Sequence, residues 1–114
     1  TLIEGIGRPR VEPSFVFDVV DRVDEVDDAD SIAAAWQLES LLGRRYGGSS
    51  GTNLVACLRL AREMRDAGQS GSLVSLLCDR GDRYDETLFD RAWLARSGID
   101  IEASLAALGT IANA

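Results

Sequence analysis

The sequence contains no histidine and no lysine, and all 12 of its basic side chains are arginine. Without histidine, and with Cys57 and Cys78 far apart in the chain, it lacks the usual ligand sets for zinc, copper and haem. It also lacks the Ser-His and Cys-His pairs that activate a nucleophile. Without lysine, no side-chain amine is available to form a Schiff base. We therefore expect no metal site in this chain and no covalent catalysis of these types by its residues alone.

Long apolar runs are missing as well. No run approaches the roughly 18 residues of a membrane-spanning helix, and no basic-then-apolar segment opens the chain. We therefore expect no membrane partner, no signal peptide and a cytoplasmic location. The net charge of -7 comes from acids spread along the chain. Such a charge repels phosphate backbones, so nucleic acid is not an expected partner.

The composition that remains is that of an ordinary globular domain. A chain of 114 residues with 46% apolar side chains fits one domain at most. Cys57 lies among apolar residues of a helical pattern, and Cys78 ends an apolar run. Both are therefore predicted to be buried thiols rather than members of a disulfide framework.

Apolar periodicity and turn residues predict alternating strands and helices. A helix is predicted to start with a cap at Asp27 or Asp28 and to end at Gly43. Its Trp36 side chain is predicted to lie in the protein core. Another helix is predicted over 52–67, closed by Gly68. Its predicted buried stripe consists of Leu54, Cys57, Leu58, Ala61 and Met64. The remaining predicted elements are strands over 22–26, 44–48 and 72–78 and helices over 88–96 and 99–114.

Residues 73–77 are nearly all apolar, which is typical of an interior parallel strand covered on both faces. The order of elements therefore predicts an α/β fold, a parallel sheet with flanking helices. Ligands of such sheets bind where strands end and helices begin. Two loops mark such positions, Gly47–Gly51 and Cys78–Tyr84. The glycine loop matches neither the Walker nor the dinucleotide pattern, so on its own it is more typical of an ordinary tight turn than of a phosphate site.

Three blocks together carry a more specific signal: Ile3–Gly7, Gly47–Thr52 and Leu77–Tyr84. In this order and spacing they resemble the cysteine synthases, fold-type-II pyridoxal-phosphate enzymes that include cystathionine β-synthase. The run from Cys78 to Tyr84 is especially similar to the B-type O-acetylserine sulfhydrylases. The resemblance extends from Thr1 to about Leu94.

The resemblance implies that residues 1–98 are the C-terminal part of a large cofactor-binding domain with a tryptophan synthase β-like fold. Residues 99–114 would form a C-terminal helical tail. The family's Schiff-base lysine and its phosphate-binding loop lie N-terminal to the blocks found here. This chain is therefore expected to be inactive alone and to act with the N-terminal remainder of the same enzyme, either as a nicked chain or in a homodimer of complete subunits.

The implied reaction is a β-replacement in which sulfide, or a related sulfur donor, replaces the leaving group of O-acetylserine or O-phosphoserine to give cysteine. Ser49 matches the serine whose hydroxyl donates to the pyridine nitrogen of pyridoxal phosphate. Gly5, Ile6 and Gly7 match a loop that lies over the cofactor near the substrate. Cys78 follows the apolar strand and is expected at the same site.

The sequence leaves more than one possible role for each of two charged residues, Asp79 and Arg8. Asp79 stands where many relatives carry a small hydroxyl residue, so its carboxylate either raises the proton affinity of the pyridine nitrogen, pairs with Arg80 or Arg83, or caps the turn. Arg8, together with Arg10, either receives an anionic leaving group or sulfur donor such as phosphoserine or thiosulfate, or faces solvent.

Other functions are compatible with the same sequence. Within the enzymes, a cystathionine β-synthase-like or a serine/threonine dehydratase-like activity acts on the same kind of small amino-acid substrate. Outside them, a non-catalytic module could keep this fold for binding a partner. A complementary chain in the preparation would favour an enzyme, and a folded monomer of this segment would favour a binding module.

Overall fold

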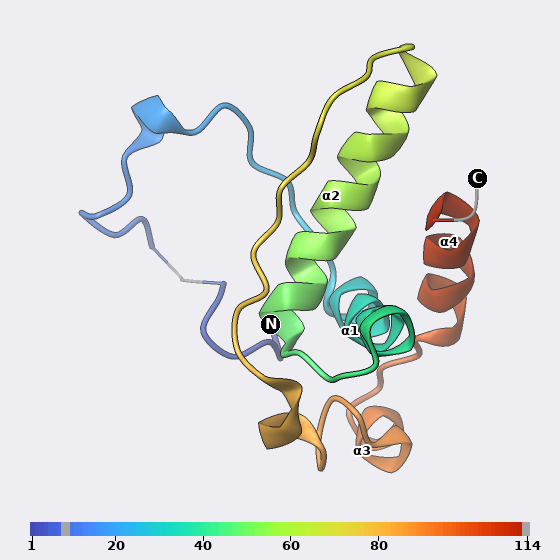
Figure 1. The fold of residues 1–114 in the computed structure, drawn as a ribbon. Coiled ribbons are helices and arrows are strands. Elements are labelled where there is room, and N and C mark those ends of the chain that lie inside the picture. The colour runs from blue at the N-terminus through green and yellow to red at the C-terminus, as the bar shows by residue number, and fades with distance from the viewer. Residues whose placement is uncertain (8–9, 113–114) are drawn as a thin grey trace.

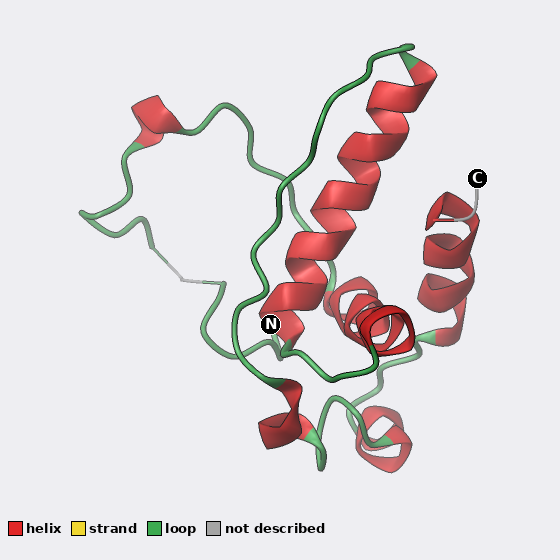
Figure 2. Cartoon of the chain, in the orientation of Figure 1, coloured by secondary structure: helices red, strands yellow, loops and turns green. Residues whose placement is uncertain are grey.

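The structure is a computed structural model that describes residues 1–7 and 10–112. Helices joined by long loops make up the described chain (Figures 1 and 2). In chain order they are the 3-10 helix η1 (Phe17–Val19), α1 (Asp28–Leu42), α2 (Gly48–Asp66), the 3-10 helix η2 (Gly81–Tyr84), α3 (Arg91–Arg96) and α4 (Glu102–Ala112). Arg8, one of the predicted site residues, and the end of the predicted tail lie outside the described residues.

The bounds of α1 confirm the prediction made from its flanking residues. The helix starts directly after Asp27 and ends before Gly43, whose φ of 73° is left-handed. The Gly43 N–H donates to the carbonyl of Glu39 at 2.9 Å, as glycine does at this position. The side chain of Asp27 makes no capping hydrogen bond. The Asp28 carboxylate accepts from the N-terminal segment instead, so the predicted side-chain cap was wrong.

The second predicted helix begins four residues earlier than expected. Gly48 is the first residue of α2, so the glycine loop forms the first helical turn rather than a turn before it. The predicted buried stripe is only half-buried, and Val55 is the buried apolar side chain of this helix. The reason is that α2 packs against α1 and α4 while its opposite side is covered by little more than an extended segment (Figure 1).

Small side chains allow α2 to approach α1 closely. Ile32 and the three alanines that follow it are fully buried on α1. A Cβ atom at Gly51 would overlap the backbone carbonyl oxygen of Ser31 and lie 2.9 Å from the nitrogen of Ala35. The Thr52 hydroxyl donates to the Ser31 hydroxyl at 2.7 Å across the same contact. These contacts place the start of α2 on the middle of α1.

Trp36 is a half-buried neighbour of the core rather than one of its fully buried members. Its indole nitrogen donates to the carbonyl of Leu88 at 2.8 Å, and its ring stacks on Phe89 at 6.3 Å between centroids. It thus joins α1 to the loop before α3.

The predicted strands are wrong for this structure, because the described residues form no strand. Between Gly43 and Gly48 the backbone makes a single antiparallel bridge, Tyr46 to Arg80. The segment 22–26 is held to α2 by side chains instead. The guanidinium of Arg22 binds the Glu63 carboxylate at 2.6 and 2.9 Å, and Arg59 donates to the carbonyl of Glu25 at 2.7 Å. These contacts involve side chains of α2 and no neighbouring strand.

Residues 72–78, the predicted interior strand, run beside α2 without a partner strand (Figure 2). A strand requires backbone hydrogen bonds from a neighbour, but side chains are the partners here. Asn53 donates to the carbonyl of Leu76 at 3.0 Å, and the Ser50 hydroxyl accepts from the Cys78 N–H at 2.8 Å. The apolar side chains stay exposed, Val74 to 93% and Leu76 to 69%. The parallel sheet is therefore not observed, and the apolar run is left uncovered.

The two cysteines are free thiols, but neither is buried. Cys57 is half-buried on α2, and Cys78 is exposed. The prediction of two buried thiols was wrong because it assumed a sheet that would cover the segment ending at Cys78.

The last two helices are shorter than predicted. Asp90 caps α3 by accepting from the Ala92 N–H at 2.9 Å, and Leu88 and Phe89 before it are buried in the core rather than helical. The Asp100 carboxylate accepts from the Glu102 N–H at 3.0 Å at the start of α4. Among the described residues, no helix has the length and apolarity needed to cross a membrane.

Candidate functional site

The three sequence blocks meet at one open pocket of about 410 Å³. Its lining consists of Glu4, Gly5, Ile6, Ser49, Cys78, Asp79, Arg83 and Tyr84. The structure therefore brings together five of the predicted site residues, from the first block, the first turn of α2 and the loop before η2. Gly7 follows Ile6 in the chain but does not line the pocket. The roles assigned to these residues stay predictions.

Asp28 positions the first block. Its carboxylate accepts from the Thr1 hydroxyl at 2.5 Å and from the Leu2 N–H at 2.6 Å. Ile3, only 3% exposed, packs on Gly48. Gly5, with φ 82°, then turns the chain along the pocket, a conformation that costs glycine little.

The two glycines before Ser49 allow two other segments to approach α2. A Cβ atom at Gly48 would lie 2.7 Å from Cδ1 of Ile3. At Gly47 it would overlap an oxygen of Asp79 and lie 2.9 Å from a ring carbon of Tyr84. The Gly47 N–H also donates to the Asp79 carbonyl at 3.0 Å. Glycine is therefore required here by close contacts within the chain.

The adjacent serines of this turn have different environments. Ser50 is 1% exposed, and its hydroxyl accepts from the Cys78 N–H at 2.8 Å, which fixes the end of the extended segment. Ser49 is half-buried at the pocket, and its hydroxyl makes no hydrogen bond to another described residue. Its hydroxyl is thus available to a ligand.

Asp79 is paired within its own loop. The Tyr84 hydroxyl donates to its carboxylate at 2.6 Å, and the Arg83 guanidinium lies 3.7 Å from the same oxygen. The hydrogen bond to Asp79, together with burial, raises the pKa of Tyr84 to about 12, because an anionic acceptor stabilises the protonated phenol. The pairing with Arg83 agrees with one of the two sequence interpretations. The pairing with Arg80 does not occur, since that side chain lies 4.0 Å from Asp82.

The part played by Tyr84 was not foreseen from the sequence. The sequence showed it only as the last residue of the Leu77–Tyr84 block, although a buried tyrosine hydroxyl usually finds a hydrogen-bond partner. The signal was its spacing, because a turn after Asp79 brings a residue five positions later back over the carboxylate.

Cys78 is the pocket's thiol. The side-chain amide of Asn53 lies 3.7 Å from its sulfur. Within the described ranges, no group of three His, Cys, Asp or Glu side chains converges as a metal site would.

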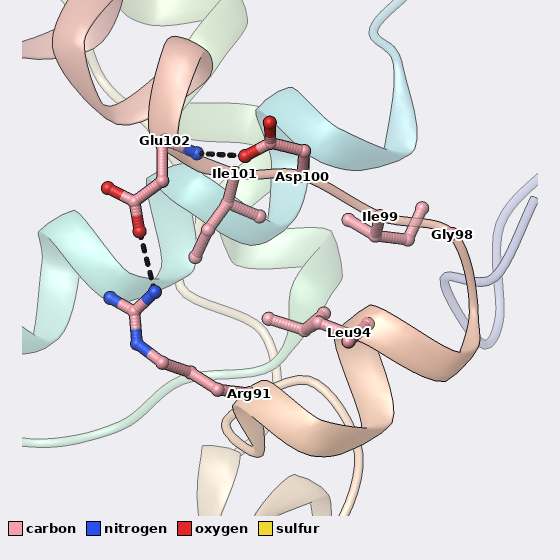
Figure 3. Close-up of a pocket in the computed structure, with 8 residues that line it drawn as sticks. Arg91, Leu94, Gly98, Ile99, Asp100, Ile101 and Glu102 are labelled. Carbon is pink, nitrogen blue, oxygen red and sulfur yellow. Dashed lines mark hydrogen bonds and ion pairs between the residues drawn. The ribbon is translucent and has the colours of Figure 1, made fainter.

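A second pocket of about 410 Å³ lies between α3 and α4 (Figure 3). Arg91 binds Glu102 across it at 2.6 Å, and Glu102 in turn receives its helix cap from Asp100. None of the predicted site residues lines it. The ion pair between Arg91 and Glu102 therefore links α3 to α4.

The first pocket offers the kind of neutral donor that the pyridine nitrogen of pyridoxal phosphate would need. This donor is the free hydroxyl of Ser49 at the start of α2, where backbone N–H groups without intrahelical acceptors are suited to an anion as well. The arginine at the pocket, Arg83, is engaged by Asp79. The chain has no lysine and therefore offers no side-chain amine for the aldehyde of the cofactor.

No family model matches the chain, but several characterised proteins do. It is 55% identical over 106 residues to the L-cysteine desulfhydrase Cds1 of Mycobacterium tuberculosis (strain ATCC 25177 / H37Ra), an alignment that covers 93% of this chain and 29% of that protein. It is 34% identical over 112 residues to an N-(2-amino-2-carboxyethyl)-L-glutamate synthase of Cupriavidus metallidurans, covering 97% of this chain and 33% of that one. Cysteine synthase 2 of Schizosaccharomyces pombe is 32% identical over 101 residues, with 87% and 25% covered. The chain thus spans a quarter to a third of the length of these relatives.

Proposed function

Because this chain belongs to the cysteine synthase family, we propose that it forms the part of a pyridoxal-phosphate enzyme of cysteine metabolism that holds the pyridine ring of the cofactor. The observation that carries the proposal is the free Ser49 hydroxyl in a pocket built from all three sequence blocks. The rest of the enzyme would supply the lysine that this chain lacks.

The proposed reaction makes or breaks the bond between sulfur and the β-carbon of cysteine. We favour release of sulfide from L-cysteine, since the 55% identical relative is an L-cysteine desulfhydrase. In that direction the α-proton and the sulfur leave, and water completes the conversion to pyruvate, sulfide and ammonia. Formation of cysteine from sulfide and O-acetylserine or O-phosphoserine is the second candidate, supported by the more distant cysteine synthases.

Pyridoxal phosphate, when bound, supplies an electron sink for bonds at the substrate's α- and β-carbons. A serine hydroxyl donates to the pyridine nitrogen without holding it protonated. Ser49 would therefore give a milder sink than a carboxylate would, which favours loss of a β-substituent over racemisation. The Gly5 and Ile6 backbone beside it can move towards a substrate because glycine tolerates many backbone conformations.

Two assays on the complete enzyme, loaded with pyridoxal phosphate, test this function. One measures sulfide released from L-cysteine, and the other measures cysteine formed from sulfide with O-acetylserine or O-phosphoserine. We expect sulfide release to dominate. Faster cysteine formation would establish the synthase activity instead, and the absence of both reactions would contradict the proposal and favour a binding module.

The preferred activated serine stays a prediction that depends on Arg8, with Arg10 beside it in sequence. In the structure the Arg10 side chain is exposed and pairs with Glu12 at 3.3 Å. If Arg8 receives an anionic leaving group, its replacement by Ala lowers the rate with O-phosphoserine relative to O-acetylserine. An unchanged ratio would leave Arg8 without this role.

A further inference from the structure

The pocket places a carboxylate beside the hydroxyl proposed to bind the cofactor's nitrogen, and the two groups would have opposite effects on the chemistry. Resting on the function proposed above, we propose that Tyr84 is a positioning residue. It holds the Asp79 carboxylate against Gly47 and so keeps it from the pyridine nitrogen, which leaves Ser49 as the partner of that nitrogen and confines the reaction to the β-carbon.

The two oxygens of Asp79 have different neighbours. One accepts the Tyr84 hydroxyl at 2.6 Å, with Arg83 at 3.7 Å. The other lies where a Cβ atom of Gly47 would be. Because the Asp79 side chain is 35% exposed, its neighbours leave it room to turn, and the bond from Tyr84 is the contact that holds its carboxylate in place.

The backbone on each side of Asp79 is also fixed. Its carbonyl accepts from the Gly47 N–H at 3.0 Å, and the Gly81 N–H donates to the Arg45 carbonyl at 2.9 Å. The Cys78 N–H before it is bound by Ser50. These bonds hold Asp79 at the pocket, so only its side-chain torsions decide where the carboxylate points.

Tyr84 is itself held firmly. It is 9% exposed, and its carbonyl accepts from the N–H groups of Thr87 at 3.1 Å and Phe89 at 3.3 Å. The ring therefore presents its hydroxyl from a fixed position. The bond to Asp79 is short and charge-assisted, the stronger class of hydrogen bond.

The consequence is chemical specificity. A carboxylate close to the pyridine nitrogen would raise its proton affinity and make the cofactor a stronger electron sink. Such a sink would promote exchange of the substrate's α-proton without loss of the β-substituent. Ser49 has no charge and does not have this effect.

The first test concerns the pair without the cofactor. In the apo enzyme, the phenol of Tyr84 is titrated by its ultraviolet absorbance as the difference between wild type and Tyr84→Phe. Asp79, Arg83 and Glu4 are the charged groups that act on it. Asp79→Asn should lower the pKa of Tyr84 from about 12 towards the ordinary 10.0. An unchanged titration in Asp79→Asn would overturn the proposal.

The second test uses the loaded enzyme. Tyr84→Phe should shift the pH dependence of the bound cofactor's visible absorbance and increase exchange of the α-proton of L-alanine with deuterium, relative to sulfide release. The double variant Tyr84→Phe/Asp79→Asn should restore both readouts, which a merely structural role of the hydroxyl would not predict. Tyr46→Phe, which removes a hydroxyl from the only other tyrosine of the chain, should change neither.

The outcomes separate this proposal from the function on which it rests. An unaltered absorbance profile in Tyr84→Phe, or a failure of the double variant to restore it, overturns the role of Tyr84 and leaves the function standing. If the wild type does not bind pyridoxal phosphate, the function fails and the proposed role fails with it.

Discussion

The hydroxyl of Tyr84 links a local contact to the pH dependence of stability. Its pKa is about 12 in the folded protein and 10.0 ordinarily. Because the pKa is raised, the Asp79 bond contributes fully below pH 10 and is lost as the pH rises through about 12. The chain has no lysine, so few other groups titrate in this window.

We therefore predict that Tyr84→Phe lowers the free energy of unfolding by about 2 kcal/mol near neutral pH, as loss of a bond to a charged acceptor does. Wild type should lose this advantage between pH 10 and about 12, so that the two stability curves converge. Urea unfolding across this range checks it, with Tyr46→Phe as control. Curves that stay parallel would mean that the bond to Asp79 does not form in solution.

At the scale of elements, the packing of α2 on α1 depends on Gly51. A Cβ atom there would overlap the Ser31 carbonyl oxygen, a backbone atom that cannot rotate away. Gly51→Ala should thus lower the free energy of unfolding by about 1–3 kcal/mol through overpacking. Gly109→Ala is the matched change in α4, where the new Cβ would meet nothing within 4 Å, and should stabilise by about 0.5–1 kcal/mol. Thermal unfolding of both variants measures these changes. Equal changes in stability for Gly51→Ala and Gly109→Ala would contradict the close contact at Gly51.

The helices, loops and pocket differ in how far the sequence could predict them. The end of α1 was predictable because Gly43 is a local signal. The strands were not, since a strand depends on a partner that a local pattern does not specify, and residues 72–78 find none. The pocket was predicted at the ends of strands, yet its residues meet because Gly47 and Gly48 admit the flanking segments to α2. Asp79 had two interpretations that only the position of Tyr84 could separate.

At the scale of the whole molecule, the uncovered apolar run is the main feature. Leu73, Val74, Leu76 and Leu77 are 38–93% exposed, and neighbouring exposed apolar side chains promote association. We predict that the isolated chain self-associates through this run and that Leu76→Ser reduces it. The control is Leu41→Ser on α1, outside the run, because Leu41 is 63% exposed and Leu76 is 69% exposed. Sedimentation at several protein concentrations measures the self-association. Equal self-association of the two variants would contradict the prediction.

The proposed function depends most on Ser49, which we propose holds the pyridine nitrogen of the cofactor in an enzyme that acts on the β-carbon of cysteine. Its most direct measurement is kcat/KM for sulfide release from L-cysteine by the complete enzyme with Ser49→Ala, together with the visible spectrum of the bound cofactor. The loss of one hydrogen bond to the cofactor should lower kcat/KM by about tenfold or more and change the spectrum, while the unfolding temperature stays close to wild type. An unchanged rate and spectrum would contradict the claim.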